Sequence, residues 1–194
     1  MAENKCKEQS NLAEQVLYSF YITQFLLLAI SAIVLWWQGK RVGNFFSFDD
    51  IHMWAWGMGA GMVILIIEAV LMVRVPESWL DDGGINRLLF HDRSWFHILM
   101  IAMIAAVSEE LFFRGVLQDW LGIWLTSVIF VLLHTRYLKK WLLVAVVFAI
   151  SVGFGVLTEY SGDLAPAVIA HGLVDFVLGL YIKNRAVEKG DTKT

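Results

Sequence analysis

Apolar runs about as long as a membrane is thick dominate this chain of 194 residues. A helix needs about 20 apolar residues to cross the hydrocarbon core of a bilayer. Runs near that length occupy residues 17–37, 51–73, 95–117, 121–133, 141–157 and 164–182. Hydrophobic residues make up 58% of the chain, and the mean hydropathy is +0.63, which exceeds that of an ordinary soluble domain. The sequence therefore predicts one polytopic membrane domain over residues 1–194.

The composition favours helices over the strands of a membrane barrel. Only two prolines interrupt the chain, and its nine tryptophans suit the interfacial ends of helices. We expect an all-α integral membrane protein with about six transmembrane helices and a polar cavity inside the membrane. A polar tail over residues 1–16 and a basic tail over residues 183–194 would flank it, and residues 74–94 would form a loop with a short interfacial helix.

Charge and cysteine content narrow the partners and the location. The net charge of −3 gives no basic excess for nucleic acid, and the single cysteine, Cys6, excludes an internal disulfide. With six helices both termini lie on one side, and most lysines and arginines fall on that side, which predicts cytoplasmic termini. The lipid bilayer is the expected surrounding, and the short chain suggests a bacterial plasma membrane.

Three ionisable residues stand inside the third apolar run: Glu109, Glu110 and Arg114. An ionisable group in hydrocarbon costs at least about 2.5 kcal/mol, so intramembrane charge indicates function and requires a partner. Glu110 and Arg114 are four residues apart and share one helix face, so they can pair across a turn. Glu109 points about 100° away from Glu110 and therefore faces another element.

Polar residues also mark two later runs. His134 follows the run 121–133, and His171 and Asp175 are four residues apart in the last run. The economical arrangement turns Glu109, His134, His171 and Asp175 toward one water-filled pocket.

Such a pocket supports two kinds of chemistry. A glutamate and a histidine that share a water can deprotonate it for attack on a carbonyl, while a second histidine donates to the developing oxyanion. The same side chains can instead bind Zn²⁺ with an open position for water, with Glu109, His134 and His171 as ligands. The residues alone leave both open.

Two features of the second run have more ordinary explanations. Gly57 and Gly61 have the spacing that lets two helices approach closely, so we expect them to serve packing. Glu68 either reaches the membrane interface or has a buried role.

Three motifs in order resemble the CPBP family of intramembrane proteases, which includes CAAX-processing and bacteriocin-processing enzymes and is also called the Abi family. Its motifs are EExxxR, FxxxH and HxxxN or HxxxD. This sequence has Glu109-Glu110-Leu-Phe-Phe-Arg114, then Phe130-Val-Leu-Leu-His134, then His171-Gly-Leu-Val-Asp175. The resemblance covers residues 95–182, which would be the catalytic core.

The resemblance implies a CAAX-type membrane endopeptidase, acting as a glutamate protease or as a metalloprotease. Glu109 and His134 would activate water, His171 and Asp175 would form the oxyanion-stabilising pair, and Glu110 and Arg114 would support the site. The CAAX branch is described as working without a catalytic metal, so we expect no cofactor, with Zn²⁺ as the alternative. The substrate would be a peptide or protein at the membrane, with prenylation left open.

One residue departs from the CAAX branch. Asp175 stands where that branch has asparagine, and because a carboxylate cannot donate a hydrogen bond, we assign it to orienting His171.

Two expectations compete with the simplest version of this site. A non-proteolytic binding, immunity or regulatory protein could use the same scaffold. In a straight six-helix arrangement, Glu109 would also lie near one end of its helix and His134 near the opposite end of the next. A tilted or re-entrant segment 121–133, or a shifted third helix, would bring the two residues closer.

Overall fold

The computed structural model describes the backbone of residues 2–188 and the side chains of residues 7–185. This part of the chain is helical almost throughout and contains no β-strand. The α-helices are α1 (Ala2–Trp37), α2 (Ile51–Arg74), α3 (Glu77–Leu80), α4 (Ile85–Phe90), α5 (Trp95–Phe112), α6 (Gln118–Leu133), α7 (Trp141–Ser161) and α8 (Ala165–Glu188). The 3-10 turns η1 (Val42–Phe45) and η3 (Thr135–Tyr137) and the π-helical turn η2 (Phe113–Leu117) complete it.

Five helical segments in the described chain are long and apolar enough to cross a membrane: Lys7–Trp37, Ile51–Arg74, Trp95–Leu133, Trp141–Ser161 and Ala165–Arg185. The prediction of an all-α integral membrane protein is confirmed. The expected third and fourth runs are merged here into one segment of 39 residues. At 1.5 Å per residue a straight helix of that length would measure nearly twice the ~30 Å hydrocarbon core.

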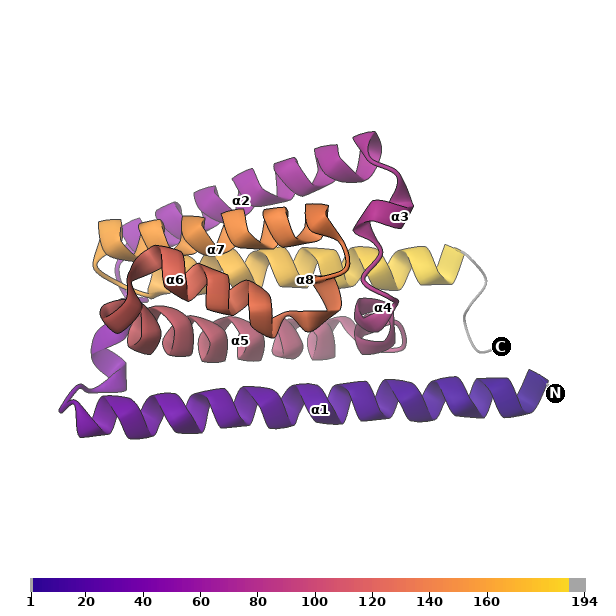
Figure 1. Cartoon of the computed structure of the whole chain (residues 1–194), viewed down its shortest axis with the longest axis horizontal. Helices are drawn as coiled ribbons and strands as arrows, with labels where there is room; N and C mark the ends of the chain where they lie inside the picture. The colour runs from indigo at the N-terminus through magenta and orange to yellow at the C-terminus, as the bar shows by residue number, and fades with distance from the viewer. Residues whose placement is uncertain (1, 189–194) are drawn as a thin grey trace.

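The 39-residue segment is not one straight helix, because its backbone breaks at Gly122. The backbone of Gly122 has φ 72° and ψ 172°, outside the helical region, and only glycine adopts such a conformation readily. Beyond the break, α6 runs back along the bundle beside α7 (Figure 1). The chain therefore changes direction within one apolar segment, and α1 begins at the same end of the bundle at which α8 ends (Figure 1).

Helix α2 packs closely on α8 through the two glycines singled out in the sequence. A Cβ added to Gly57 would lie 2.8 Å from the Pro166 carbonyl oxygen, and one added to Gly61 would lie 3.2 Å from the Ala170 carbonyl oxygen. No larger side chain fits between these backbones without a shift. The packing role predicted for Gly57 and Gly61 is confirmed.

The polar segments at one end are more ordered than a tail and a loop. The predicted tail 1–16 continues α1 back to Ala2, since its alanines, glutamates and glutamines are good helix formers. The segment 74–94 contains α3 and α4, so the expected short interfacial helix is present as two. Cys6 and residues 186–194 lie outside the described side chains, and the division into tails and core stays a prediction.

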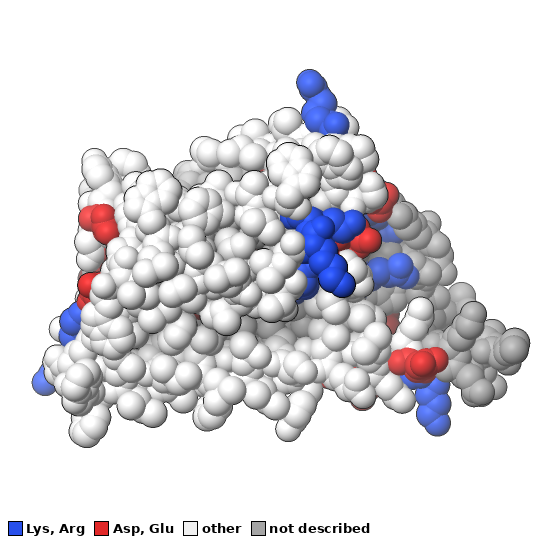
Figure 2. Space-filling model, viewed as in Figure 1, with Lys and Arg blue, Asp and Glu red and all other residues white. Residues whose placement is uncertain are grey.

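Charged residues separate between the two ends of the bundle. In Figure 2 most visible lysines and arginines gather toward the end at which α1 begins and α8 ends. Arg74 closes α2 there, and Arg136, Lys139 and Lys140 precede α7. Lys40 at the other end pairs with Asp119. The apolar surface between the two ends matches a bilayer.

Candidate functional site

The centre of the site is a buried ion pair at the junction of α5 and η2. Arg114 Nε lies 3.2 Å from Glu110 Oε2, and Arg114 Nη1 donates to Glu110 Oε1 at 3.2 Å. The pair forms across one helical turn, as the spacing predicted. Arg114 Nη2 donates to the backbone and side-chain oxygens of Ser151 on α7, each at 3.0 Å. A guanidinium fork with this many acceptors is well compensated for its burial.

Aromatic rings enclose the guanidinium of Arg114. Its Cζ lies 5.1 Å from the ring centre of Phe130, 5.7 Å from that of Phe154 and 5.9 Å from that of Phe113. These distances suit cation–π attraction. Arg114 thus joins α5, α6 and α7, and the π-helical turn that carries it is a distortion often found at functional sites.

Three carboxylates converge on the imidazole of His171 in α8. Its Nδ1 lies 2.8 Å from Glu110 Oε1, while its Nε2 lies 3.5 Å from Asp175 Oδ2 and 4.0 Å from Glu109 Oε2. The ring of Phe154 stacks on it at 5.5 Å. Glu110 is therefore the nearest partner of His171, closer than Asp175. A ring held at both nitrogens has a fixed orientation.

Glu109 faces α1, which settles the direction that helical spacing left open. Its Oε1 accepts a hydrogen bond from Gln24 Nε2 at 3.1 Å, and the side-chain oxygen Oε1 of Gln24 accepts from Ser108 Oγ at 2.5 Å. Gln24 is only 4% exposed. Sequence reasoning missed this residue; the available signal was an amide side chain within the first apolar run.

His134 stands apart from these carboxylates. It caps the end of α6, its Nδ1 lies 2.8 Å from the Phe130 carbonyl oxygen, and its ring stacks on Phe130 and Tyr137. It makes no hydrogen bond or ion pair with the cluster within the described chain. The structure brings together Glu109, Glu110, Arg114, His171 and Asp175, and it joins His134 to them only through the ring of Phe130.

The proposed zinc ligands are not arranged around a common point. Among the described residues, no group of three or more histidine, cysteine, aspartate or glutamate side chains has a geometry that could hold a metal ion. Three of the relevant atoms already have other neighbours, because Glu109 Oε1 meets Gln24, His171 Nδ1 meets Glu110 and His134 Nδ1 meets a carbonyl oxygen. The set Glu109, His134 and His171 does not fit a tetrahedral zinc site in this conformation.

Glu68 on α2 lies at the edge of the cluster. One of its carboxylate oxygens is buried without a hydrogen-bond partner in the described structure, and its charge is close enough to Asp175 for repulsion. This placement favours the buried alternative over a side chain that reaches the interface. Asp175, whose side chain is 34% exposed, is the most accessible of the carboxylates around His171.

Comparison with known proteins relates the chain to a protein family and to a bacterial relative. Residues 91–177 match the family described as type II CAAX prenyl endopeptidase Rce1-like. The chain is also 34% identical over 171 residues to the uncharacterized protein YpbD of Bacillus subtilis (strain 168), which covers 87% of this chain and 90% of YpbD. No solved structure matches the chain. The family match begins just before α5, so α1 and α2 lie outside it.

Proposed function

Because the chain belongs to the Rce1-like family of type II CAAX prenyl endopeptidases, we propose that it is an intramembrane endopeptidase that hydrolyses a peptide bond with water activated by Glu109. One observation carries the proposal. Glu109 has one carboxylate oxygen tied to Gln24, while the other faces His171 Nε2 across 4.0 Å. That gap is too wide for a direct hydrogen bond and suits a bridging water.

Glu109 acts as the general base in this proposal. Its Oε2 takes a proton from the water as the water oxygen attacks the scissile carbonyl carbon. When the tetrahedral intermediate collapses and the carbon–nitrogen bond breaks, Glu109 returns the proton to the leaving amine. With a side chain 12% exposed, Glu109 is screened from bulk water without being fully buried.

His171 stabilises the oxyanion. When the ring is protonated, Nδ1 donates to Glu110, and the Nε2 N–H can turn from its long 3.5 Å contact with Asp175 Oδ2 to the developing negative charge. Asp175 and Glu110 keep the ring in position, and Arg114 holds Glu110. The asparagine-to-aspartate departure at Asp175 is compatible with this division, because orientation of His171 requires only an acceptor.

His134 is proposed as the second residue on the attacking water, with support from the FxxxH motif alone. To reach Glu109 it must leave its contact with the Phe130 carbonyl oxygen, for example when substrate enters beside α6. A His134→Ala variant therefore separates two outcomes. Activity lost as in Glu109 variants favours a shared water, and activity retained would assign the chemistry to Glu109 and His171.

The proposed substrate is a peptide or protein segment at the membrane, and the family description supports a prenylated C-terminus. The test is cleavage of a farnesylated CAAX peptide by purified protein in phosphatidylcholine vesicles. We expect Glu109→Gln to lower the cleavage rate by at least about 100-fold, because a general base accelerates a reaction by about 100-fold to 10,000-fold. Unchanged cleavage by this variant would overturn the proposal.

Two controls accompany this test, one for the loss of charge and one for a metal-dependent reaction. Glu14→Gln, an exposed carboxylate on the polar part of α1, removes the same charge away from the site and is expected to leave the rate unchanged. Chelation with EDTA is expected to leave it unchanged as well, since the proposed water activation uses Glu109. A rate that falls with EDTA and returns with Zn²⁺ would replace the glutamate mechanism with a metal-dependent one.

A further inference from the structure

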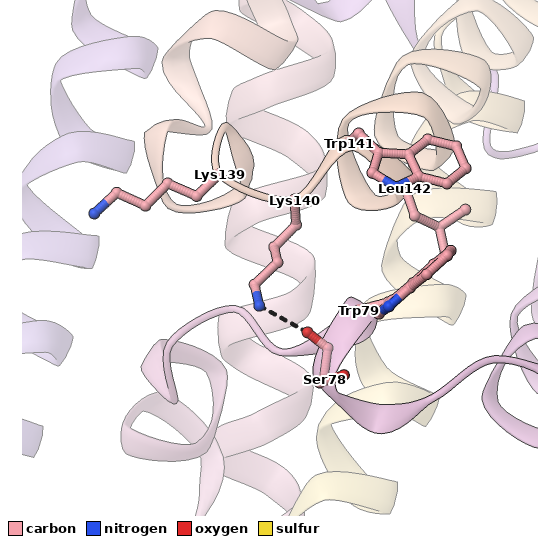
Figure 3. A pocket seen from close by; sticks show the side chains of 6 residues that line it. All are labelled: Ser78, Trp79, Lys139, Lys140, Trp141 and Leu142. Atoms are coloured by element: carbon pink, nitrogen blue, oxygen red, sulfur yellow. Dashed lines mark hydrogen bonds between the residues drawn. The ribbon is translucent and has the colours of Figure 1, made fainter.

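A cavity of about 340 Å³ lies between α3 and the beginning of α7. None of the residues of the Glu109 cluster lines it. It is lined by Ser78, Trp79, Lys139, Lys140, Trp141 and Leu142 (Figure 3). Trp141 is the first residue of the fourth membrane-spanning segment. The cavity therefore lies at the level where the apolar core of a bilayer meets its headgroups.

Its walls divide into an apolar half and a cationic half. Trp79 and Trp141 meet edge to face at 5.7 Å, and both remain exposed, at 46% and 66%. Figure 3 shows Leu142 beside them and the Lys140 side chain on the opposite side of the cavity. Exposed tryptophans at this depth are typical of the membrane interface.

Lys140 supplies the polar contact. Its Nζ donates to the Ser78 carbonyl oxygen at 2.7 Å, which fixes the ammonium at the rim and leaves two of its three N–H donors for another acceptor. Lys139, the second lysine of the lining, extends away from the tryptophans in Figure 3. The two adjacent lysines that line the cavity, Lys139 and Lys140, attract an anion to this rim.

We propose that this cavity binds the headgroup of an anionic phospholipid. The phosphate would accept from Lys140 Nζ, while the glycerol and first acyl carbons would lie against Trp79, Trp141 and Leu142. A free phosphate ion would use the lysines and leave the apolar wall uncovered, and an electrically neutral lipid would gain nothing from the lysines. The volume falls within the range of pockets for small ligands.

The experiment uses the full chain in phosphatidylcholine nanodiscs that contain increasing fractions of brominated phosphatidylglycerol, which quenches nearby tryptophans. The chain has nine tryptophans, so the signal of the cavity is the difference between the natural protein and Trp141→Phe. We expect this component to be quenched at a several-fold lower fraction of brominated phosphatidylglycerol than of brominated phosphatidylcholine.

A double variant, Lys139→Gln with Lys140→Gln, should reduce that preference at least about fivefold, since one lysine near a membrane surface contributes that much. The matched control is Arg74→Gln with Lys183→Gln, which removes two charges from the same end of the bundle and should keep the preference. Equal quenching by both lipids would overturn the proposal. So would equal losses in the two double variants, or displacement of the lipid by inorganic phosphate.

Discussion

Arg114 shows how a single buried residue can hold three helices together. Its guanidinium binds Glu110 and Ser151 and lies among three aromatic rings, so its removal leaves Glu110 charged and dependent on His171. Breaking a buried pair in this way costs about 3–5 kcal/mol. We expect Arg114→Met to lower the free energy of unfolding by about that amount, measured by chemical denaturation in detergent micelles.

The Arg114 effect has an internal control. Adding Glu110→Gln to Arg114→Met removes the orphaned charge and should recover part of the lost stability. If the double variant is less stable than Arg114→Met alone, the loss comes from packing among the rings and the ion-pair explanation is wrong.

Gln24 is expected to position Glu109. Gln24→Leu keeps the volume of the side chain but removes the donor to Glu109 Oε1, so the carboxylate can rotate away from the reacting carbonyl. Misplacement of a catalytic group by about 1 Å can lower a rate 100-fold. We expect kcat for the farnesylated peptide to fall about tenfold to 100-fold with little change in KM.

Two further variants test whether Gln24 acts by donating a hydrogen bond to Glu109. Gln24→Glu keeps a polar side chain but places a second carboxylate beside Glu109, so it should also be impaired, whereas Gln24→His supplies a donor and should recover part of the rate. Equal kcat in Gln24→Leu and the natural protein would contradict the positioning role.

Among the contacts of the site, the sequence predicted only those between neighbours within one helix. Spacing of four within one helix predicted the Glu110–Arg114 pair and placed His171 beside Asp175, because helix geometry alone fixes those neighbours. The contact between Gln24 and Glu109 joins residues 85 positions apart, and the closest partner of His171, Glu110, is 61 positions away. Local periodicity carries no information about such pairs.

At the scale of elements, the close packing of α2 on α8 gives a matched pair of substitutions. Gly57→Ala would place a Cβ 2.7 Å from Ile169 Cβ and 2.8 Å from a backbone oxygen, so the helices must separate. We expect a loss of about 1–3 kcal/mol in unfolding free energy. Gly59→Ala, on the same helix with nothing within 4 Å, should leave stability unchanged or raise it slightly.

Thermal unfolding in detergent followed by circular dichroism measures both variants. The prediction fails if the two substitutions change the unfolding temperature equally, because the close approach at Gly57 would then carry no energetic weight.

The turn of the chain at Gly122 is the feature of the third apolar segment that the sequence did not predict. The sequence left two arrangements open, a tilted or re-entrant segment 121–133 or a shifted third helix, and the structure turns the chain at Gly122 so that α6 runs back along the bundle (Figure 1). Nothing in the sequence distinguishes Gly122 from the other glycines of the chain, since only its positive φ reveals the turn. The sequence placed His134 directly after this run, as observed, but its placement relative to Glu109 depends on the direction that α6 takes after the break.

At the scale of the whole molecule, we propose that the end rich in lysine and arginine is cytoplasmic. Arg74 and Arg136 lie at that end together with the start of α1 and the end of α8 (Figure 1). The positive-inside rule then places the short connection around Arg41 outside the cell.

Cysteine labelling in intact bacterial cells tests this orientation. In a Cys6→Ser background, Arg41→Cys should react with a membrane-impermeant maleimide in intact cells, and Arg74→Cys should react only after lysis. Labelling in the reverse order would invert the proposed topology.

The hydrogen bond from Gln24 to Glu109 also bears on how the protein is assembled. Synthesis proceeds from the N-terminus, so α1 is in the membrane before α5 leaves the ribosome. A carboxylate that entered the bilayer alone would have no hydrogen-bond partner. For Glu109 the donor, the side-chain amide of Gln24, is already in the membrane. The family-matched segment 91–177 made without α1 would lack the Gln24 donor. Its insertion into the membrane would then require another hydrogen-bond donor for Glu109.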